Sequence, residues 1–229
     1  MLSPVEKVRL LSLVDVLQPL SREQIEKLSW QVSDLQLQKG AIFYAPGDPS
    51  EKAFILRKGR VQIYRLVAGR ELTLAMVGPG TVFGDIALTA PRLHGAYAQA
   101  MEPTEVSVVS NAVLRRLILK HPEVGLQIAD LLSERLSMQE SRMAEIAFKE
   151  VPARLASFIL RLVEGESVVT REGYRIPTRY THQQLGTFIG TSREAVTNAF
   201  TLLREAGAVK VICRHIYVKD IQALRRIAG

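Results

Sequence analysis

The sequence predicts an α+β protein in which an antiparallel β-roll is followed by a long helix and a winged helix-turn-helix. Three observations support this prediction. Short apolar runs separated by glycine fill residues 35–110, a heptad of apolar positions follows in residues 121–150, and two capped helices joined by a glycine occupy residues 181–207. Alternation with a period of two indicates strands, whereas apolar residues three and four apart indicate helices. At 229 residues, two domains are expected rather than one.

Residues 3–33 are expected to be helical. One side of an amphipathic first helix would be formed by Leu10, Leu13, Val14 and Leu17, and Ser21 with Gln24 would cap a second helix. The opening stretch lacks a clear signal-peptide cleavage pattern, and the longest apolar runs are too short to span a bilayer. We therefore expect a cytoplasmic protein without a membrane partner.

The central part of the chain reads as a series of short strands, each with its turn. The segments are AIFYAPGD, AFILRKG, RVQIYRLVAG, ELTLAMVGPG, GTVFGDIAL, GAYAQAMEP and TEVSVVS. Many short strands with glycine turns are typical of an antiparallel sandwich or barrel. A barrel of this size can enclose one small ligand.

A long helix is expected after His121-Pro122, extending to about Glu150. Residues spaced alternately three and four apart form a heptad seam, namely Ala129, Leu132, Leu136, Gln139, Met143 and Ile146. A seam of this kind needs a partner, and the simplest partner is the same helix of a second chain. The alternative is packing within the chain, and a second stripe could do this while the first dimerises, namely Val124, Ile128, Leu131 and Met138.

The last domain is expected to begin at Val151-Pro152, because proline suits a first helical turn. The segment ARLASFILRLVEG then reads as an amphipathic helix. A small hairpin follows, formed by Val168–Thr170 and Tyr174–Pro177.

Two further helices follow, joined by a tight turn. Thr181 and Gln184 have capping-box spacing, Gly190 ends the first helix, and Thr191 begins the second, with Ser192 as the alternative cap. The apolar face of the second helix is formed by Val196, Ala199, Phe200 and Leu203. Polar residues occupy the free face, namely Ser192, Arg193, Glu194, Thr197 and Asn198. This is the part of a recognition helix that meets base edges in the major groove, whereas the alternative is an ordinary helical hairpin.

The segment AVKVICRHIYVKD, directly after this helix, reads as a hairpin. Arg214 and His215 at its tip suit contact with DNA phosphates, and Cys213 is expected to be a small buried residue. The net charge of +7 fits a polyanionic partner. With a single cysteine, the chain can form neither an internal disulfide nor a cysteine-ligated iron–sulfur cluster.

Nothing in the sequence favours an enzyme. The four histidines, which are His94, His121, His182 and His215, fall in different elements and lack metal-ligand spacing. A nucleophile elbow, a P-loop and a dinucleotide fingerprint are all missing. We expect neither a catalytic site nor a bound metal.

The order of elements resembles the family of the cyclic-AMP receptor protein and the fumarate–nitrate reduction regulator (CRP/FNR family). The matching motifs are GTSREAVTNAFTLLREAG, KGAIFYAPGD, FILRKGRVQIY, GPGTVFGDIAL and PARLASFIL. The resemblance implies a bacterial homodimeric transcription factor, usually an activator that recruits RNA polymerase to pseudo-palindromic promoter sites. It divides the chain into a cyclic-nucleotide-binding-like β-roll with N-terminal helices (1–120), a dimerisation helix (121–150) and a winged helix-turn-helix domain (151–229).

The resemblance also assigns roles to the recognition helix. Arg193 matches the arginine that donates to a guanine, and Glu194 matches the glutamate that accepts from cytosine N4. Asn198 stands where the cyclic-AMP receptor protein has a second arginine, and asparagine prefers adenine. Phosphate contacts are implied for Thr181, Gln183 and Ser192, to which His182 and Thr197 are added. The polymerase-contacting loop would be about Glu166–Tyr174.

The resemblance is weakest in the effector pocket. Gly84-Asp85 replaces the Gly-Glu pair that holds the ribose, and His94-Gly95 replaces the Arg-Ser/Thr pair that clamps the cyclic phosphate. Gln139 and Glu140 stand at the adenine-contacting positions, so cyclic AMP is not the expected effector.

Two alternatives for the pocket remain open. In one, the pocket is empty and the dimer binds DNA constitutively. In the other it holds a small anion, because Arg135 and Glu140 align with ligand-contacting residues of the cyanobacterial nitrogen-control regulators, which sense 2-oxoglutarate. Alternatively, Arg135 forms a salt bridge with Glu134, Asp130 or a partner chain.

Overall fold

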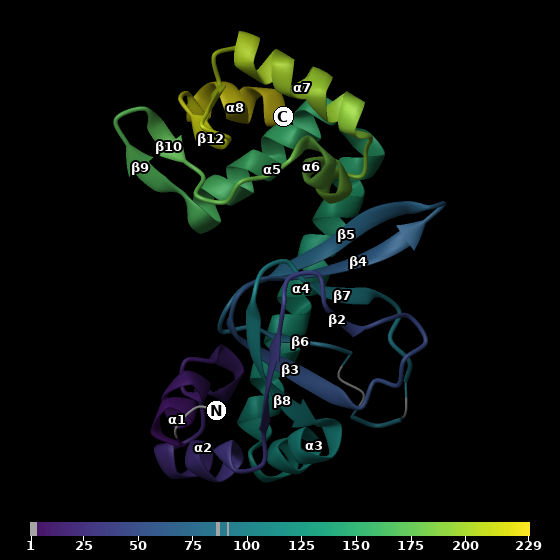
Figure 1. Ribbon diagram of the computed structural model, residues 1–229, viewed down its shortest axis with the longest axis vertical. Helices are drawn as coiled ribbons and strands as arrows, with labels where there is room; N and C mark the ends of the chain where they lie inside the picture. The colour runs from purple at the N-terminus through teal and green to yellow at the C-terminus, as the bar shows by residue number, and fades with distance from the viewer. Residues whose placement is uncertain (1–3, 86–87, 91) are drawn as a thin grey trace. The chain divides into compact units, whose positions relative to one another are not determined.

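The computed structural model describes residues 4–85, 88–90 and 92–229. They divide into two compact units, one of Met1–Leu66 with Thr73–Ser137 and one of Val67–Leu72 with Met138–Gly229. Most elements of both are labelled in Figure 1. Within the described ranges, none of the helices combines the length and the apolar character that crossing a membrane requires.

The N-terminal segment contains the two expected helices, but the first is shorter than its predicted apolar side requires. Helix α1 (Pro4–Leu11) ends early, a 3-10 turn η1 (Asp15–Leu17) follows, and α2 (Arg22–Ser29) begins after Ser21. The expectation of a single apolar side is wrong, because Leu13 is 62% exposed. The turn after Leu11 instead directs Val14 and Leu17 into the core. The predicted capping box at Ser21 is confirmed.

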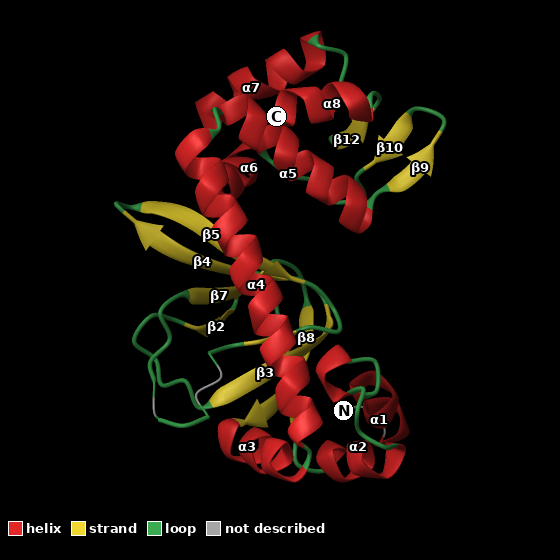
Figure 2. Ribbon diagram, turned by 180° about the vertical axis from the view of Figure 1, so that it is seen from behind, coloured by secondary structure: helices red, strands yellow, loops and turns green. Residues whose placement is uncertain are grey.

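Two four-stranded sheets form the predicted β-roll, drawn in yellow in Figure 2. The first has the order β1 (Ser33–Leu37), β8 (Thr104–Ser110), β3 (Lys52–Lys58) and β6 (Val82–Phe83). The second has the order β2 (Ile42–Tyr44), β7 (Tyr97–Ala100), β4 (Val61–Val67) and β5 (Arg70–Val77). The β1–β8, β3–β8 and β4–β7 pairs are antiparallel, as predicted. The part of the expected GTVFGDIAL segment at residues 86–87 lies outside the described residues.

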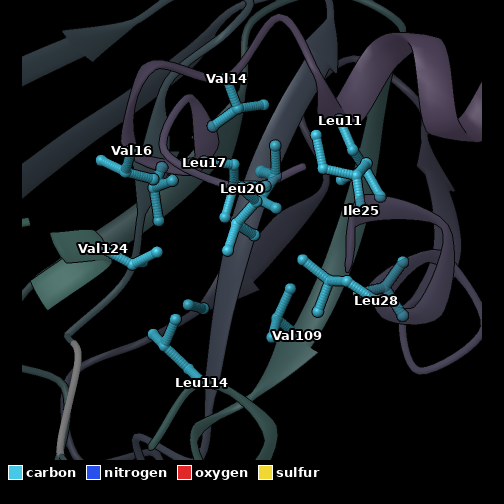
Figure 3. Close-up of a cluster of buried hydrophobic side chains, with 14 of the residues drawn as sticks. Leu11, Val14, Val16, Leu17, Leu20, Ile25, Leu28, Val109, Leu114 and Val124 are labelled. Carbon is cyan, nitrogen blue, oxygen red and sulfur yellow. The ribbon is translucent and has the colours of Figure 1, made fainter. Parts of the chain in front are cut away.

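Apolar side chains hold the roll together in two clusters. One lies between the sheet of β1, β8 and β3 and the helices, and includes Leu11, Leu28, Val109 and Leu114 (Figure 3). The other contains Phe54, Leu56, Val61, Phe83 and Val106. Burial of this apolar surface is the main stabilising term for the unit.

Helix α3 (Asn111–Lys120) precedes the long helix α4 (Pro122–Phe148), close to the predicted bounds. Val124 and Ile128 are buried in the first cluster, and Leu131 packs against it. The predicted continuation of this stripe to Met138 is wrong, since Met138 is 62% exposed. The apolar seam residues stay exposed in the single chain, namely Leu132, Leu136, Met143 and Ile146.

The second unit packs helices against a small sheet. Its elements are α5 (Val151–Glu166), β9 (Val168–Thr170), β10 (Gly173–Arg175), α6 (His182–Ile189), α7 (Arg193–Glu205), β11 (Val209–Ile212), β12 (His215–Val218) and α8 (Ile221–Ala228). The sheet order is β11-β12-β10-β9, so the two predicted hairpins join through β10 and β12. Leu155, Ile159, Leu203 and Leu224 are among its fully buried side chains.

Candidate nucleic-acid interface and effector pocket

The turn between α6 and α7 is set by local hydrogen bonds and two glycines. Thr181 caps α6 through the predicted capping box with Gln184, and Gly190 ends the helix in a left-handed conformation. The Thr191 amide then donates to the Gly186 carbonyl at 2.9 Å. A β-carbon on Gly186 would lie 2.7 Å from the Thr191 carbonyl oxygen, so only glycine fits this close approach. The sequence reading missed Gly186.

Helix α7 presents a polar face over its first two turns. Ser192 is the cap, because its hydroxyl accepts from the Ala195 amide; Thr191, the first choice for this role, lies one residue before it. The predicted apolar face is buried. Arg193, Glu194, Thr197 and Asn198 are exposed, so the free face expected from the sequence is present.

The carboxylate of Glu194 is tied to the beginning of α7. Its pKa lies below the ordinary value, first because its own main-chain N–H donates to it and then because the Ser192 hydroxyl does. It is therefore ionised at neutral pH and can only accept hydrogen bonds. This is the state required to receive the amino group of cytosine.

His182 and Thr197 contact each other across the turn. Nδ1 of His182 lies 2.8 Å from Oγ1 of Thr197, and the imidazole stacks on Phe200. The Thr197 hydroxyl donates its proton to the Arg193 carbonyl at 3.0 Å. It must therefore accept from His182, which places the histidine proton on Nδ1. Burial, and then the charge of Arg193, lower the pKa of His182.

The β11–β12 hairpin is the predicted wing, and its tip has an unusual conformation. Cys213 and Arg214 form a two-residue turn and have φ angles of 50° and 66°. Cys213 is exposed, so the expectation of a small buried residue is wrong; a turn at the tip of a hairpin has no core to enter. Arg214, in the same turn, is also exposed.

His215 is held within the protein by both ring nitrogens. Nδ1 lies 3.2 Å from the Ile176 carbonyl, and Nε2 accepts from Arg179 Nε at 3.2 Å. The wing is thereby connected to the segment that precedes α6. Arg179, an exposed cation that the sequence reading missed, is placed beside the wing by this bond.

A second polar cluster lies in the β-roll, where the sequence placed the effector pocket. His94 is buried, stacks on the Tyr44 ring at 3.7 Å, and has Nδ1 2.9 Å from Asp85 Oδ2. Burial raises the pKa of the Tyr44 hydroxyl, and the Asp85 carboxylate raises it further. The residues aligned with the ribose acid and the phosphate clamp are thus hydrogen-bonded to each other.

Arg135 faces the same cluster from α4. Its guanidinium donates to the Val82 carbonyl, a partner different from the carboxylates of Glu134 and Asp130 that the sequence suggested. Burial lowers the pKa of Arg135. Gly84 has a φ of 107°, and Gly95 accepts from Arg65 Nε at 2.8 Å. Gln139 and Glu140 belong to the part of α4 assigned to the other unit.

Two family models match the chain. The cyclic nucleotide-binding domain model matches residues 34–121, and the Crp-like helix-turn-helix domain model matches residues 153–227. The first match contains the Tyr44, Asp85 and His94 cluster. The second contains α6, α7 and the wing.

Individual proteins of known sequence or structure agree with these matches. The chain is 31% identical to the Global nitrogen regulator of Synechocystis sp., over 80% of this chain and 82% of that protein. It is 30% identical to the Cyclic AMP receptor protein of Thermus thermophilus, over 91% and 94% of the two chains. The structure of a CooA mutant from Carboxydothermus hydrogenoformans has the same fold, with a TM-score of 0.81, 23% identity and 95% coverage of both chains.

Proposed function

This chain belongs to the CRP/FNR family of DNA-binding transcription regulators, and we propose that it acts as a homodimer that recruits RNA polymerase at pseudo-palindromic promoter sites. The observation that carries the proposal is the exposed polar face of α7 beside a basic wing. A helix with this face fits the major groove, and a wing tip with Arg214 fits the adjacent phosphates. The net charge of +7 supports binding to a polyanion.

Each polar side chain of α7 has a distinct role in this proposal. The planar guanidinium of Arg193 donates two hydrogen bonds to guanine O6 and N7. The ionised Glu194 accepts from cytosine N4, and Asn198 reads adenine at an inner position of the half-site. Thr197 contributes by supporting its neighbours, because its hydroxyl is engaged between His182 and the Arg193 carbonyl.

The phosphate contacts come from the edges of the helix-turn-helix. Gln183 is exposed on α6, while Thr181 and Ser192 lie at the two helix N-termini, where dipoles and main-chain N–H groups favour anions. Arg214 extends the contact at the wing. His215 supports it indirectly by holding Arg179 beside the wing.

Dimerisation places two such helices on one DNA duplex. Leu132, Leu136, Met143 and Ile146 keep large apolar surfaces exposed along one seam of α4. Exposed apolar surface at heptad spacing favours pairing with a second helix. Two half-sites separated by about one turn of DNA, roughly 34–36 Å, then match the dimer.

The cluster of Asp85, His94 and Tyr44 argues against cyclic AMP as the effector. An imidazole that already bonds to Asp85 is a poor clamp for a cyclic phosphate, for which a bidentate guanidinium is suited. We propose a regulator that binds DNA without cyclic AMP. Its cellular concentration then sets the response.

One observation favours a second candidate, in which the pocket senses a small anion. Arg135 is a partly buried cation whose guanidinium donates to a main-chain carbonyl, so a carboxylate ligand would find an unneutralised charge. A dicarboxylate resembling 2-oxoglutarate has this chemistry. The similarity to a nitrogen regulator supports the same class.

Selection of bound sequences from a random DNA pool tests the DNA-binding proposal. We expect a pseudo-palindrome with guanine and cytosine at the positions facing Arg193 and Glu194. Affinity for the selected site should fall steeply with salt, as phosphate contacts require. Failure to enrich any inverted repeat would contradict the proposal.

Calorimetric titration with cyclic AMP and with 2-oxoglutarate separates the two effector candidates. If neither ligand produces a heat of binding, the result supports regulation without either effector. Saturable binding of 2-oxoglutarate, abolished in Arg135→Gln, supports the anion sensor. Tight binding of cyclic AMP would overturn both.

A further inference from the structure

A groove lies between α2 and α3 in the first unit, apart from the Tyr44, Asp85 and His94 cluster. Both helices lie at the end of the first unit that carries the start of α4 (Figures 1 and 2), and residues of both line the groove. The groove has a volume of about 430 Å³, within the range of roughly 300–1,000 Å³ typical of small-molecule sites. Its apolar wall is formed by Leu28, Val113 and Leu117.

Positive charge surrounds this apolar wall. Lys27, Arg116 and Lys120 line the groove, and among its described lining residues there is no carboxylate. Lys27 is already paired with Glu23 at 2.6 Å, so Arg116 and Lys120 carry the net charge. Helix α3, with the sequence NAVLRRLILK, contains no acidic residue that could neutralise them. A ligand with an anionic head and an apolar body is complementary to these cations and to the apolar wall.

A small void lies directly behind the groove. It has a volume of about 20 Å³ and is lined only by apolar side chains, among them Leu17, Leu114 and Ile128. Leu28 and Leu117 line both the groove and the void, so they form the wall between the two. Figure 3 shows Leu28, Val109 and Leu114 gathered in this part of the core. Apolar voids stay dry and accept apolar groups.

We propose that this groove binds a medium-chain acyl carboxylate. The carboxylate lies between Arg116 and Lys120, and the chain covers Leu117 and reaches toward the void past Leu28. Each methylene that leaves water strengthens binding about fourfold. The site is a second ligand input on the sensor unit, and it requires neither DNA nor the β-roll effector.

A chain-length series tests the proposal on the full-length protein. Butyrate, hexanoate and octanoate are titrated below their micelle concentrations, and amide shifts are followed by NMR. We expect affinity to rise about sixteenfold from hexanoate to octanoate, two methylenes at about fourfold each, with shifts centred on α2 and α3. Octanol should bind more weakly than octanoate because it lacks the charge. Equal binding of butyrate and octanoate, or shifts spread over the surface, would overturn the proposal.

Paired substitutions locate the head group. Arg116→Gln with Lys120→Gln should weaken octanoate binding at least tenfold. Arg115→Gln is the matched control, because Arg115 lies on the same helix but does not line the groove. All three positions are exposed, so thermal unfolding should be nearly unchanged. Wild-type octanoate affinity in the double variant would refute the site.

Discussion

Nδ1 of His182 and Oγ1 of Thr197 lie 2.8 Å apart and join α6 to α7 across the helix-turn-helix. Because the Thr197 hydroxyl donates to the Arg193 carbonyl, the second ring nitrogen of His182 carries no proton in the neutral state. A neutral Nε2 is an acceptor and cannot donate to a phosphate oxygen. Protonation would convert it into a charged donor.

DNA affinity should therefore depend on the protonation of His182. Burial and Arg193 hold the pKa of the free protein below the ordinary 6.5, and a nearby phosphate would raise the pKa in the complex. A pKa raised by binding gives an affinity gain that is complete below the free-state pKa and is lost as pH rises through the bound-state pKa. Fluorescence anisotropy should show that DNA affinity rises as the pH falls from about 8 to about 6. The rise should be larger in the wild type than in His182→Gln.

The stability of the free protein should show the opposite trend. A histidine whose folded pKa is depressed stabilises the folded protein at pH values above its unfolded pKa. This stability is lost as the pH falls from the unfolded pKa to the folded pKa. Urea unfolding at several pH values separates this effect from DNA binding. Identical pH profiles for wild type and His182→Gln in both assays would contradict the coupling.

Replacing Arg193 with alanine should weaken binding to the selected site by about 1–3 kcal/mol and relax specificity at one base pair. The control is Arg204→Ala, which removes the same charge from the other end of the exposed face of α7. We expect Arg204→Ala to change affinity only through the weaker, sequence-independent electrostatic term. Equal losses in the two variants, without a change in base preference, would refute the docking of α7.

The second unit could be predicted from sequence in some detail because its signals are local. The Thr181 and Gln184 capping box, the Gly190 turn and the apolar face of α7 depend on residues a few positions apart. The close approach at Gly186 and the bond between His215 and Arg179 depend on tertiary contacts. Such contacts leave no periodic signal, so the sequence reading missed both.

Charge placed on the α4 seam should prevent dimerisation. Leu136 is 61% exposed in the single chain, and a lysine there would bring two like charges together at the helix pair. Leu136→Lys should shift the protein to monomer in analytical ultracentrifugation and reduce operator affinity. Leu119→Lys, at an exposed leucine of α3, is the control and should leave the mass unchanged. A dimeric Leu136→Lys protein would show that another surface holds the dimer.

Loss of Asp85 should destabilise the β-roll by leaving the buried His94 without its carboxylate. We expect Asp85→Ala to cost about 1 kcal/mol, because an unsatisfied buried polar group is unfavourable and the half-exposed Asp85 reduces the effect. Phenylalanine at position 94 keeps the stacking on Tyr44 and needs no polar partner. His94→Phe should therefore recover stability in the Asp85→Ala background. Chemical denaturation of the wild type, the two single variants and the double variant measures the coupling between the two positions. Unfolding free energies that simply add in the double variant would contradict the prediction.

Sequence reasoning could identify the residues of this cluster but not their arrangement. Alignment with a ligand site identifies Gly84, Asp85, His94 and Gly95. Such an alignment treats each residue as a separate contact to the ligand. The bond between Asp85 and His94, and the stacking on Tyr44, arise because three separate strands and loops converge. The bond from the Arg135 guanidinium to the Val82 carbonyl was likewise not predictable, because it joins residues 53 positions apart.

The strained wing tip should lower the stability of the protein while it contributes to DNA affinity. Cys213 and Arg214 both have positive φ in a two-residue hairpin, a conformation that asparagine and glycine adopt far more readily than cysteine or arginine. Arg214→Gly should relieve this strain and stabilise the protein by about 0.5–1 kcal/mol. The same change removes a cation from the proposed phosphate contact, so affinity and its salt dependence should both fall.

Cys213→Asn is the matched control, because it relieves strain at the neighbouring position without changing the charge. It should raise the midpoint of thermal unfolding and leave DNA affinity unchanged. An Arg214→Gly protein that is both more stable and fully active would show that the tip arginine makes no contact with DNA.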